Sequence, residues 1–447
     1  MLCQVQSSPR AARLPGRVLI FDNGLCRGRN GAGCKPDRQE RIIAMQPIDR
    51  RTFLRTTLAA AGVVVGGERL ARSATATGPQ PPLPCPPTAW RKHGIALAPT
   101  EPWEGEHIQS FTSPTEPIEK NRWRIWYTAC DPRQKQTIAY AEGSPGEPMK
   151  KYPAQCTPGR PGDGPFTLGN LPEKWKPVQV VHIHMRNGRH RIYFWAHGPA
   201  VARYLAADSD DGRRYRVIDP HRPVLYHPHD RAAWGVPSPD GVMLHKTPSG
   251  DRPADEPVAP SRLISNDATN VYQLPDGTFE LYSVGLVPVP KDDPAYMPHD
   301  NAPGLLRMID RYTSEDGLRF ETRTRIIQRD AKDPVDQQFY YLAVTYTPRG
   351  RVGMLGHYRC QAQTMDLEWC FSSDGVKWDR PRRSAWLPRG EKGEPDSYGI
   401  YAPSALVHRD GRYHLFYTGV NTSHNGKESY GKPRTVILYA TTDSIWA

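Results

Sequence analysis

Residues 367–380 read LEWCFSSDGVKWDR, and this stretch decides the expected fold. Leu367, Trp369 and Phe371 stand at alternate positions, which is the period of a β-strand. The strand then meets Asp374-Gly375, a pair that suits a tight hairpin turn because glycine adopts positive φ without steric cost. The stretch therefore predicts a strand, a turn and the start of a second short strand.

Comparable stretches recur along the chain. The others are QTIAYAEGSPG (136–146), ARYLAADSDDGRRYR (202–216), RMIDRYTSEDGLRFE (307–321) and VILYATTDSIW (436–446). An aromatic-rich strand stands before each of the five: NRWRIWYTA (121–129), GRHRIYFWAH (188–197), DGTFELYSVG (276–285), RGRVGMLGHY (349–358) and DGRYHLFYTG (410–419). One more apolar strand precedes each of these: HIQSFTSP (107–114), VQVVHIHM (178–185), TNVYQL (269–274), YYLAVTYT (340–347) and SALVHR (404–409).

Five units of four strands predict an all-β fold, a five-bladed β-propeller. A single four-stranded sheet cannot bury both of its faces, whereas radial packing of several sheets can. We expect residues 436–446 to close the ring near the first strands, because closure removes free sheet edges. The alternative is a β-sandwich, which also has many short strands but does not repeat one pattern five times.

A different signal lies near the N-terminus. Arg50-Arg51-Thr52-Phe53-Leu54-Arg55 resembles the twin-arginine export signal. The apolar run 58–67 is too short to span a bilayer, and Ala74-Thr75-Ala76 supplies a small-residue cleavage site. We therefore expect a periplasmic or extracellular protein. The alternative is a core helix that happens to follow two arginines.

The export signal divides the chain. Met45 stands five residues before the arginine pair, where an initiator is expected. Residues 1–44 show no periodicity and are interpreted as a start codon placed too early, with a disordered extension as the alternative. Residues 45–76 are then the signal peptide, 77–89 a Pro-rich linker and 90–447 the propeller domain.

The charge of the chain depends on this division. The formal net charge of +12 invites a nucleic-acid interpretation. Residues 1–76 hold 13 of the 59 Lys and Arg and 5 of the 47 Asp and Glu, so residues 77–447 carry 46 basic and 42 acidic side chains, a net +4. We expect no nucleic-acid partner, no membrane insertion after cleavage, and a monomer.

Five cysteines remain after the signal peptide, an odd number whose spacing is not that of a zinc site. Cys360 and Cys370 could meet across neighbouring strands. A disulfide between them is permitted by export but not required by it.

The repeated units resemble the five-bladed propeller superfamily of arabinanases, β-xylosidases, invertases and levansucrases, the glycoside hydrolases of family 43 and family 32 type. NDATNVYQLPDGTFELYSVG (266–285) and YAPSALVHRDGRYHLFYTG (401–419) carry the likeness to an uncharacterised exported bacterial branch. The resemblance implies action on a poly- or oligosaccharide by carboxylates at the mouth of the propeller channel. The alternative is a non-catalytic propeller that binds a glycan or a protein.

The chemistry of that superfamily needs two carboxyl groups across the glycosidic bond. Family 43 enzymes use an Asp, an Asp and a Glu on blades one to three, and this chain departs from that pattern. We expect Asp267, at the head of the third inner strand, to be essential, with Glu106 as its partner and Asp336 as a further catalytic candidate. Asp267 could instead cap a turn.

Six further residues are expected to contact a sugar: Asn270, His107, Glu104, Asp396, Tyr398 and Tyr401. A tyrosine offers a stacking face together with a hydroxyl, although both tyrosines could equally belong to the core. The two glutamates near residue 105 could be solvated loop charges.

Histidines raise the question of a metal. His182 and His184 share one face of a strand, and His227, His229 and Asp230 follow. The sequence offers no identifiable third ligand, so these histidines are interpreted as structural, and no metal or other cofactor is expected; nothing supports a structural Ca²⁺. Residues 220–260 are interpreted as a rim loop, or else a solvated insertion.

Overall fold

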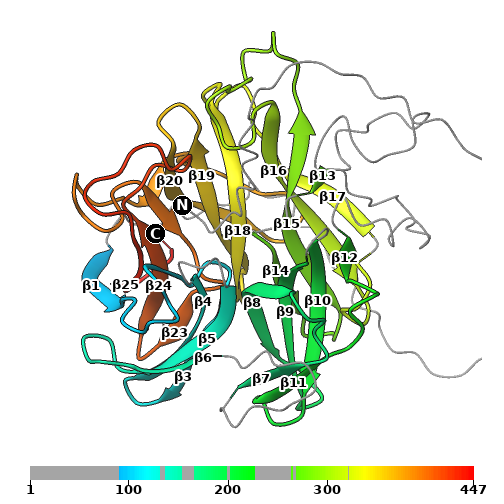
Figure 1. Ribbon diagram of the computed structural model, residues 1–447. Coiled ribbons are helices and arrows are strands. Elements are labelled where there is room, and N and C mark those ends of the chain that lie inside the picture. The colour runs from blue at the N-terminus through cyan, green and yellow to red at the C-terminus, as the bar shows by residue number, and fades with distance from the viewer. Residues whose placement is uncertain are drawn as a thin grey trace, which may run out of the picture. The chain divides into compact units, whose positions relative to one another are not determined.

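The structure is a computed structural model that describes residues 90–130, 136–153, 166–198, 202–226, 263–264, 268–320 and 322–446. Every regular element among these residues is a β-strand, so the expected all-β class is confirmed (Figure 1). The described strands belong to one compact unit that contains residues 82–447. Within the described part of the chain, no helix is present that could cross a membrane.

The hairpin turns follow the local pattern seen in the sequence. Asp374 accepts hydrogen bonds from the N–H groups of Val376 and Lys377 at 2.8 and 2.9 Å, and Ser372 Oγ lies 3.1 Å from the same carboxylate. Gly375 has a φ of +79°, where a side chain would be strained. Ser209-Asp210-Asp211-Gly212 and Ser314-Glu315-Asp316-Gly317 form the same kind of turn. The repeated motif is thus a repeated set of local hydrogen bonds.

The largest sheet has 14 strands. Its members from the first part of the chain are β1 (Arg91–Leu97), β2 (His107–Gln109), β3 (Thr115–Glu119), β4 (Arg122–Cys130), β5 (Gln136–Gly143) and β6 (Lys150–Pro153). Its members from the last part are β18 (Gln337–Thr347), β19 (Gly350–Arg359), β20 (Thr364–Ser372), β21 (Ala385–Leu387), β22 (Gly399–Tyr401), β23 (Val407–Arg409), β24 (Arg412–Val420) and β25 (Thr435–Thr442).

Two further sheets come from the middle of the chain. One has six strands: β7 (Thr167–Gly169), β8 (Lys176–His184), β9 (His190–His197), β10 (Ala202–Ser209), β11 (Arg214–Val217) and β12 (Leu225–Tyr226). The other has five strands: β13 (Leu263–Ile264), β14 (Asn270–Gln273), β15 (Phe279–Pro288), β16 (Leu305–Ser314) and β17 (Thr322–Ile327). Most neighbouring strands in both are antiparallel hairpin partners.

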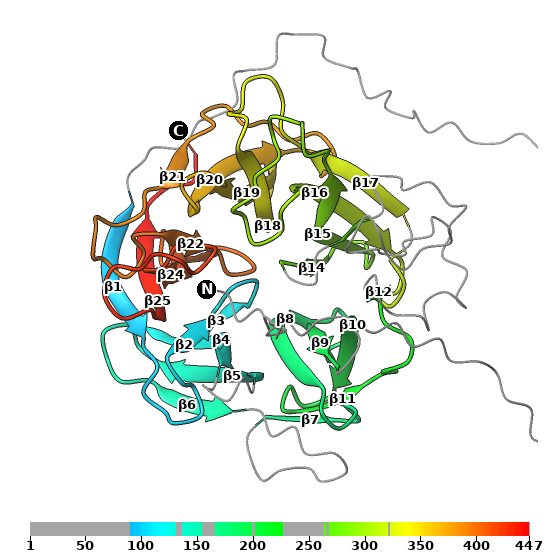
Figure 2. The same ribbon diagram turned by 45° about the horizontal axis from the view of Figure 1, so that its top comes forward.

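The two ends of the described unit meet in one sheet. Strand β25 pairs antiparallel with β1 over five residue pairs and touches β2 through the parallel pair His107–Thr435. The contact expected between residues 436–446 and the first strands is therefore present. Figure 2 shows the sheets arranged around a middle toward which β2, β8, β14, β18 and β22 face. This arrangement fits a β-propeller.

The core consists of four clusters of buried apolar residues packed between the sheets. Large aromatic side chains, including Trp126, Trp195 and Tyr341, are completely buried. Gly356 in β19 allows Tyr341 to pack closely, since an added Cβ would lie 2.5 Å from its ring. Cys360 and Cys370 are both buried and both free, so the disulfide left open by the sequence does not form.

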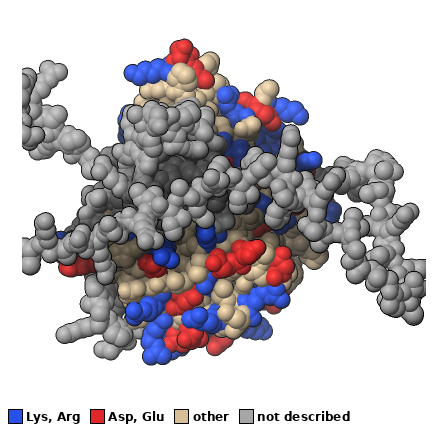
Figure 3. Space-filling model, turned by 90° about the vertical axis from the view of Figure 1, so that its right-hand side faces the viewer, with Lys and Arg blue, Asp and Glu red and all other residues tan. Residues whose placement is uncertain are grey.

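Surface charge agrees with the near-neutral balance of residues 77–447. On the face seen in Figure 3, basic and acidic side chains are interspersed over the described surface. Many of the exposed charges are paired locally, for example Arg189 with Asp210 at 2.7 Å. Such exposed pairs add little stability, but they keep either sign from dominating the surface.

We predict that Asp374→Ala lowers the free energy of unfolding by about 1–2 kcal/mol, because the turn loses its carboxylate acceptor. Hydrogen bonds from the Lys377 and Val376 N–H groups lower the pKa of Asp374 below its ordinary 3.8. Its contribution is therefore present above pH 3.8 and is lost as pH falls through the lowered pKa. Urea unfolding at pH 7 and pH 3 measures both effects. Asp292→Ala, at an exposed loop position, is the matched control and should stay within about 0.5 kcal/mol of the parent.

Candidate functional site

The inner strands β2, β8, β14, β18 and β22 all begin at the same edge of their sheets. Antiparallel pairing fixes this edge: Asn270 opposes Tyr282, Gln337 opposes Arg359, and Gly399 opposes Val420. The loops that join β15 to β16 and β24 to β25 lie at this edge too, since they connect strand ends there. It is the edge at which the sequence places the candidate catalytic and sugar-binding residues.

Asp267 lies outside the described residues, directly before the described start of the third inner strand. Ala268, the next residue, has a φ of +54° and donates its N–H to Gln179 Oε1 at 3.0 Å. Asn270 is completely buried, and its Nδ2 donates to the carbonyl of Leu342 at 3.0 Å. Its Oδ1 has no hydrogen-bond partner among the described residues. Asn270 thus ties β14 to β18 and keeps one buried acceptor unused.

Asp336 directly precedes β18 and is buried. It accepts hydrogen bonds from Arg359 Nη2 at 2.7 Å and from the Gln361 N–H at 3.1 Å. Burial favours the neutral acid, but Arg359 and the N–H outweigh it, so the pKa of Asp336 is lowered. Asp336 is therefore a carboxylate at neutral pH.

The residues predicted near β22 bind different partners. Asp396 accepts from Lys92 Nζ at 2.7 Å and from the Tyr417 hydroxyl at 2.9 Å. Tyr398 donates to Glu428 at 2.9 Å and stacks on Tyr430 with ring centroids 4.9 Å apart.

The three candidates near β2 also differ from one another. Glu104 is completely buried and accepts from the Tyr127 hydroxyl at 2.8 Å and from Lys151 Nζ at 2.6 Å. Glu106 is half exposed and pairs with Lys432. His107 lies in β2, and burial lowers its pKa. The structure therefore gives Glu104 a structural role in its loop, whereas Glu106 remains accessible at its edge.

A buried network that the sequence did not reveal joins three segments at this edge. Its members, here called the Arg307 network, are Asp300, Arg307, Gln338, Tyr340, Tyr358, Tyr401 and His424. Arg307 Nη1 donates to Asp300 at 2.8 Å and to Gln338 Oε1 at 2.7 Å. The Tyr358 hydroxyl donates to the other oxygen of Asp300 at 2.5 Å. The one predicted residue in the network is Tyr401.

Aromatic rings surround the charges of the network. The Arg307 guanidinium lies 5.2 Å from the ring centre of Tyr340 and 5.3 Å from that of Tyr358. The His424 ring packs against the same two tyrosines, with centroids 4.8 and 4.7 Å away, and its Nδ1 lies 3.0 Å from the Tyr401 hydroxyl. Its Nε2 is buried without a hydrogen-bond partner among the described residues.

The electrostatics of the network are well defined. Burial opposes ionisation of Asp300, but Arg307 and the Tyr358 hydroxyl outweigh it, and the pKa of Asp300 is lowered far below its ordinary range. Burial, together with the positive charge of Arg307, lowers the pKa of His424 to about 3. At neutral pH the network therefore holds one ion pair and a neutral imidazole.

Sequence reasoning missed this network because its members are far apart along the chain. The one available signal was the polar run Met297-Pro298-His299-Asp300-Asn301 in a Pro-rich connection. A buried charge needs a partner, so such a run beside an inner strand could have marked Asp300.

No described carboxyl has a raised pKa. Wherever a shift is resolved among the described Asp and Glu residues, it is downward, and the buried ones are held by cations. Glu280 is an example: burial is outweighed by Arg351, Tyr346 and Arg311. None of these shifted groups is suited to donate a proton at neutral pH.

No family model and no curated protein matches the chain. Among solved structures it is similar to a glycoside hydrolase, at 15% identity and a TM-score of 0.51, over 81% of this chain and 93% of that one. It is also similar to an N-acetylgalactosamine deacetylase from F. plautii in complex with blood group B trisaccharide (14% identity, TM-score 0.45, 79% and 95% of the chains). A thermostable family-43 glycoside hydrolase matches at 13% identity with a TM-score of 0.44, over 74% and 88%. The likeness to the first of these confirms, at the level of the fold, the resemblance to glycoside hydrolases expected from the sequence.

We predict that His424 makes the protein sensitive to mild acid. The unfolded chain binds a proton on this histidine below its ordinary pKa of 6.5, whereas the folded protein does so only near pH 3. The free energy of unfolding should therefore fall between pH 6.5 and about 3, by up to about 1.4 kcal/mol per pH unit from this group. Urea unfolding at pH 7, 6 and 5 measures the slope, which should be smaller in His424→Gln. The exposed-site control His408→Gln should keep the parent slope, and three equal slopes would contradict the prediction.

Proposed function

We propose that this chain acts on a poly- or oligosaccharide at the edge where the inner strands begin. The observation that carries the proposal is the Arg307 network in a fold shared with a glycoside hydrolase. Tyrosine rings and fixed hydrogen-bonding groups together suit a sugar, which has apolar ring faces and many hydroxyls. The unused Asn270 Oδ1 and His424 Nε2 add an acceptor and a ring nitrogen at the same edge.

The proposed reaction is hydrolysis of a glycosidic bond. It needs one carboxyl that protonates the leaving oxygen and a second that activates water or attacks the sugar. Asp267 is our first candidate for an essential carboxyl, because it heads the third inner strand beside Asn270. Glu106, half exposed at the same edge, is the proposed partner. Asp336 is held ionised by Arg359 and suits a role as base or charge stabiliser rather than acid.

We predict that Asp267→Asn lowers the turnover of the substrate by about 10²–10⁴-fold, the usual loss when a general acid or base is removed. The substrate is first identified by reducing-sugar release from a panel of plant and algal glycans. Asp276→Asn is the matched control, because Asp276 lies in the turn at the far end of strand β14 and bonds only locally to Thr278. Unchanged turnover in Asp267→Asn, with a slightly lower melting temperature, would make Asp267 a turn cap.

A second candidate function is binding of a glycan or a protein without catalysis. It is favoured by one specific observation, namely that the resolved pKa shifts of the described carboxyls are all downward. The two functions differ in outcome. A catalytic protein releases sugar from one member of the panel, whereas a binding protein retains a glycan on an array and releases nothing from any of them.

We further propose that the sheets form five blades. The 14-stranded sheet contains only single-pair parallel contacts between β20 and β22 and between β2 and β25. Dividing it at these contacts gives β2–β6, β18–β21 and β22–β25 with β1, beside the two middle sheets. A crystal structure with another number of blades would refute this division.

Export is the remaining proposal about function, and it rests on Arg50-Arg51 and Ala74-Thr75-Ala76. We predict that the mature protein begins near Thr77 and lies outside the cytoplasmic membrane. N-terminal sequencing of material from the periplasm or medium measures the start. An Arg50→Lys, Arg51→Lys variant should remain inside the cell with residues 45–76 attached, because the export machinery reads the arginine pair. Secretion of that variant at the parent level would argue against the twin-arginine route.

A further inference from the structure

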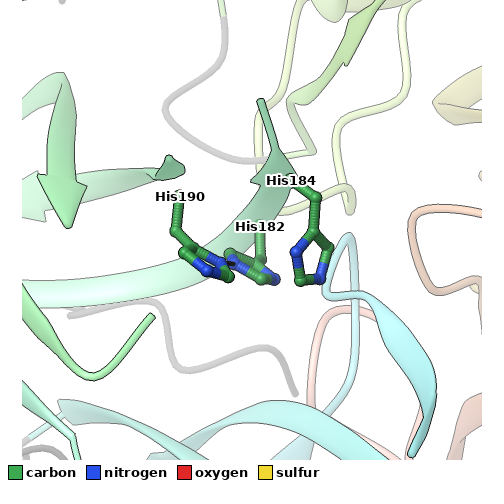
Figure 4. A group of neighbouring side chains, drawn as sticks. All are labelled: His182, His184 and His190. Atoms are coloured by element: carbon green, nitrogen blue, oxygen red, sulfur yellow. Dashed lines mark hydrogen bonds between the residues drawn. The ribbon is translucent and has the colours of Figure 1, made fainter. Parts of the chain in front are cut away.

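Three histidines gather at the edge where the inner strands end, opposite the edge that carries the Arg307 network. His182 and His184 lie near the end of β8, and His190 opens the antiparallel strand β9. His184 and His190 are paired across the hairpin. Residues two apart on a strand share a face, and directly opposed residues share it as well, so the three rings stand together on one face of the hairpin (Figure 4).

The spacing of the rings suits a metal ion. One nitrogen from each histidine can be chosen so that all three lie within 4.8 Å of one another. His182 Nε2 and His190 Nδ1 are 3.2 Å apart. Two nitrogens that bind one tetrahedral ion at about 2.0–2.1 Å stand about 3.3 Å from each other, so this pair already has the required separation.

A carboxylate orients the most buried of the three rings. Glu116, in strand β3, contacts His182 Nδ1 and lies 3.6 Å from His184 Nε2. A hydrogen bond between Nδ1 and the carboxylate leaves Nε2 of His182 to face His190. Carboxylate, histidine and metal stand in this order in many protein metal sites, where the carboxylate sets the ring orientation and raises the basicity of the ligand.

The surroundings allow an ion to enter and be held. The His182 side chain is 1% exposed and packs against Trp126, whereas the His184 side chain is 64% exposed. Gly212 leaves room for the ring of His190, since an added Cβ would lie 2.9 Å from it. The site is thus rigid on its inner side and open to solvent at His184.

We propose that His182, His184 and His190 bind a divalent transition-metal ion of the Zn²⁺ class, with Glu116 as a positioning residue for His182. Three imidazoles suit Zn²⁺ or its neighbours better than Ca²⁺ or Mg²⁺, which take oxygen ligands. Three protein ligands leave a fourth position to water on the exposed side. The sequence indicated two of these histidines; the hairpin between β8 and β9 supplies the third.

The test is metal binding by the full-length chain, purified without a polyhistidine tag and dialysed against Zn²⁺. Inductively coupled plasma mass spectrometry should find about one zinc per chain, and Zn²⁺ should raise the melting temperature. His184→Gln alters an exposed side chain, so the variant should fold, and it should weaken zinc binding at least about 10-fold. Glu116→Gln should weaken it about 10–100-fold while keeping all three ligands.

Two controls separate this site from other histidines. His221→Gln, at an exposed turn, should bind zinc like the parent. The double variant His227→Gln, His229→Gln, which alters residues outside the described part of the chain, should also bind zinc like the parent. Absence of stoichiometric zinc in the parent, an unchanged Kd in His184→Gln, or loss of zinc only in the double variant would each overturn the proposal.

Discussion

The pairing of strand β25 with both β1 and β2 is the constraint on which the rest of the structure depends. A four-stranded antiparallel sheet has two faces and two edges, and in isolation it would leave one face and both edges in water. Packing the sheets face to face buries their aromatic residues, and the pairing of β25 with β1 joins the two ends of the described unit. Loss of that closure would expose core clusters at both ends.

Closure also explains why function is expected at the ends of the strands. The middle of each strand is committed to packing and to the ladder of backbone hydrogen bonds. The loops at the ends are free of that duty and can carry polar side chains. The Arg307 network uses the loop between β15 and β16 together with strands β16, β18 and β19, and the segment after β24. The histidine cluster uses the turn between β8 and β9 at the other edge.

Buried charges in this protein are paired across sheets, and the pairs set which carboxyls are ionised. Arg307 holds Asp300, Arg380 holds Asp333, and Glu280 is held by Arg311 and Arg351. Each carboxyl would otherwise be forced toward its neutral form by burial. Removing one partner from such a pair leaves a buried charge and is strongly destabilising. A proton donor must therefore come from outside these pairs, which is why Asp267 is the first candidate.

The sequence by itself determined the features that depend on near neighbours: the alternating strands, the Ser-x-Asp-Gly turns and the start of each inner strand. It correctly indicated the all-β class, the contact between residues 436–446 and the first strands, and the position of Asn270 at an inner-strand start. Only the tertiary structure decided which polar residues meet. Lys92 reaches Asp396 from 304 positions away, Arg307 reaches Gln338 across two sheets, and His190 joins His182 and His184 through the hairpin. Local patterns follow from φ preferences and the two-residue period of a strand, whereas these contacts depend on how whole sheets pack, which no stretch of sequence encodes alone.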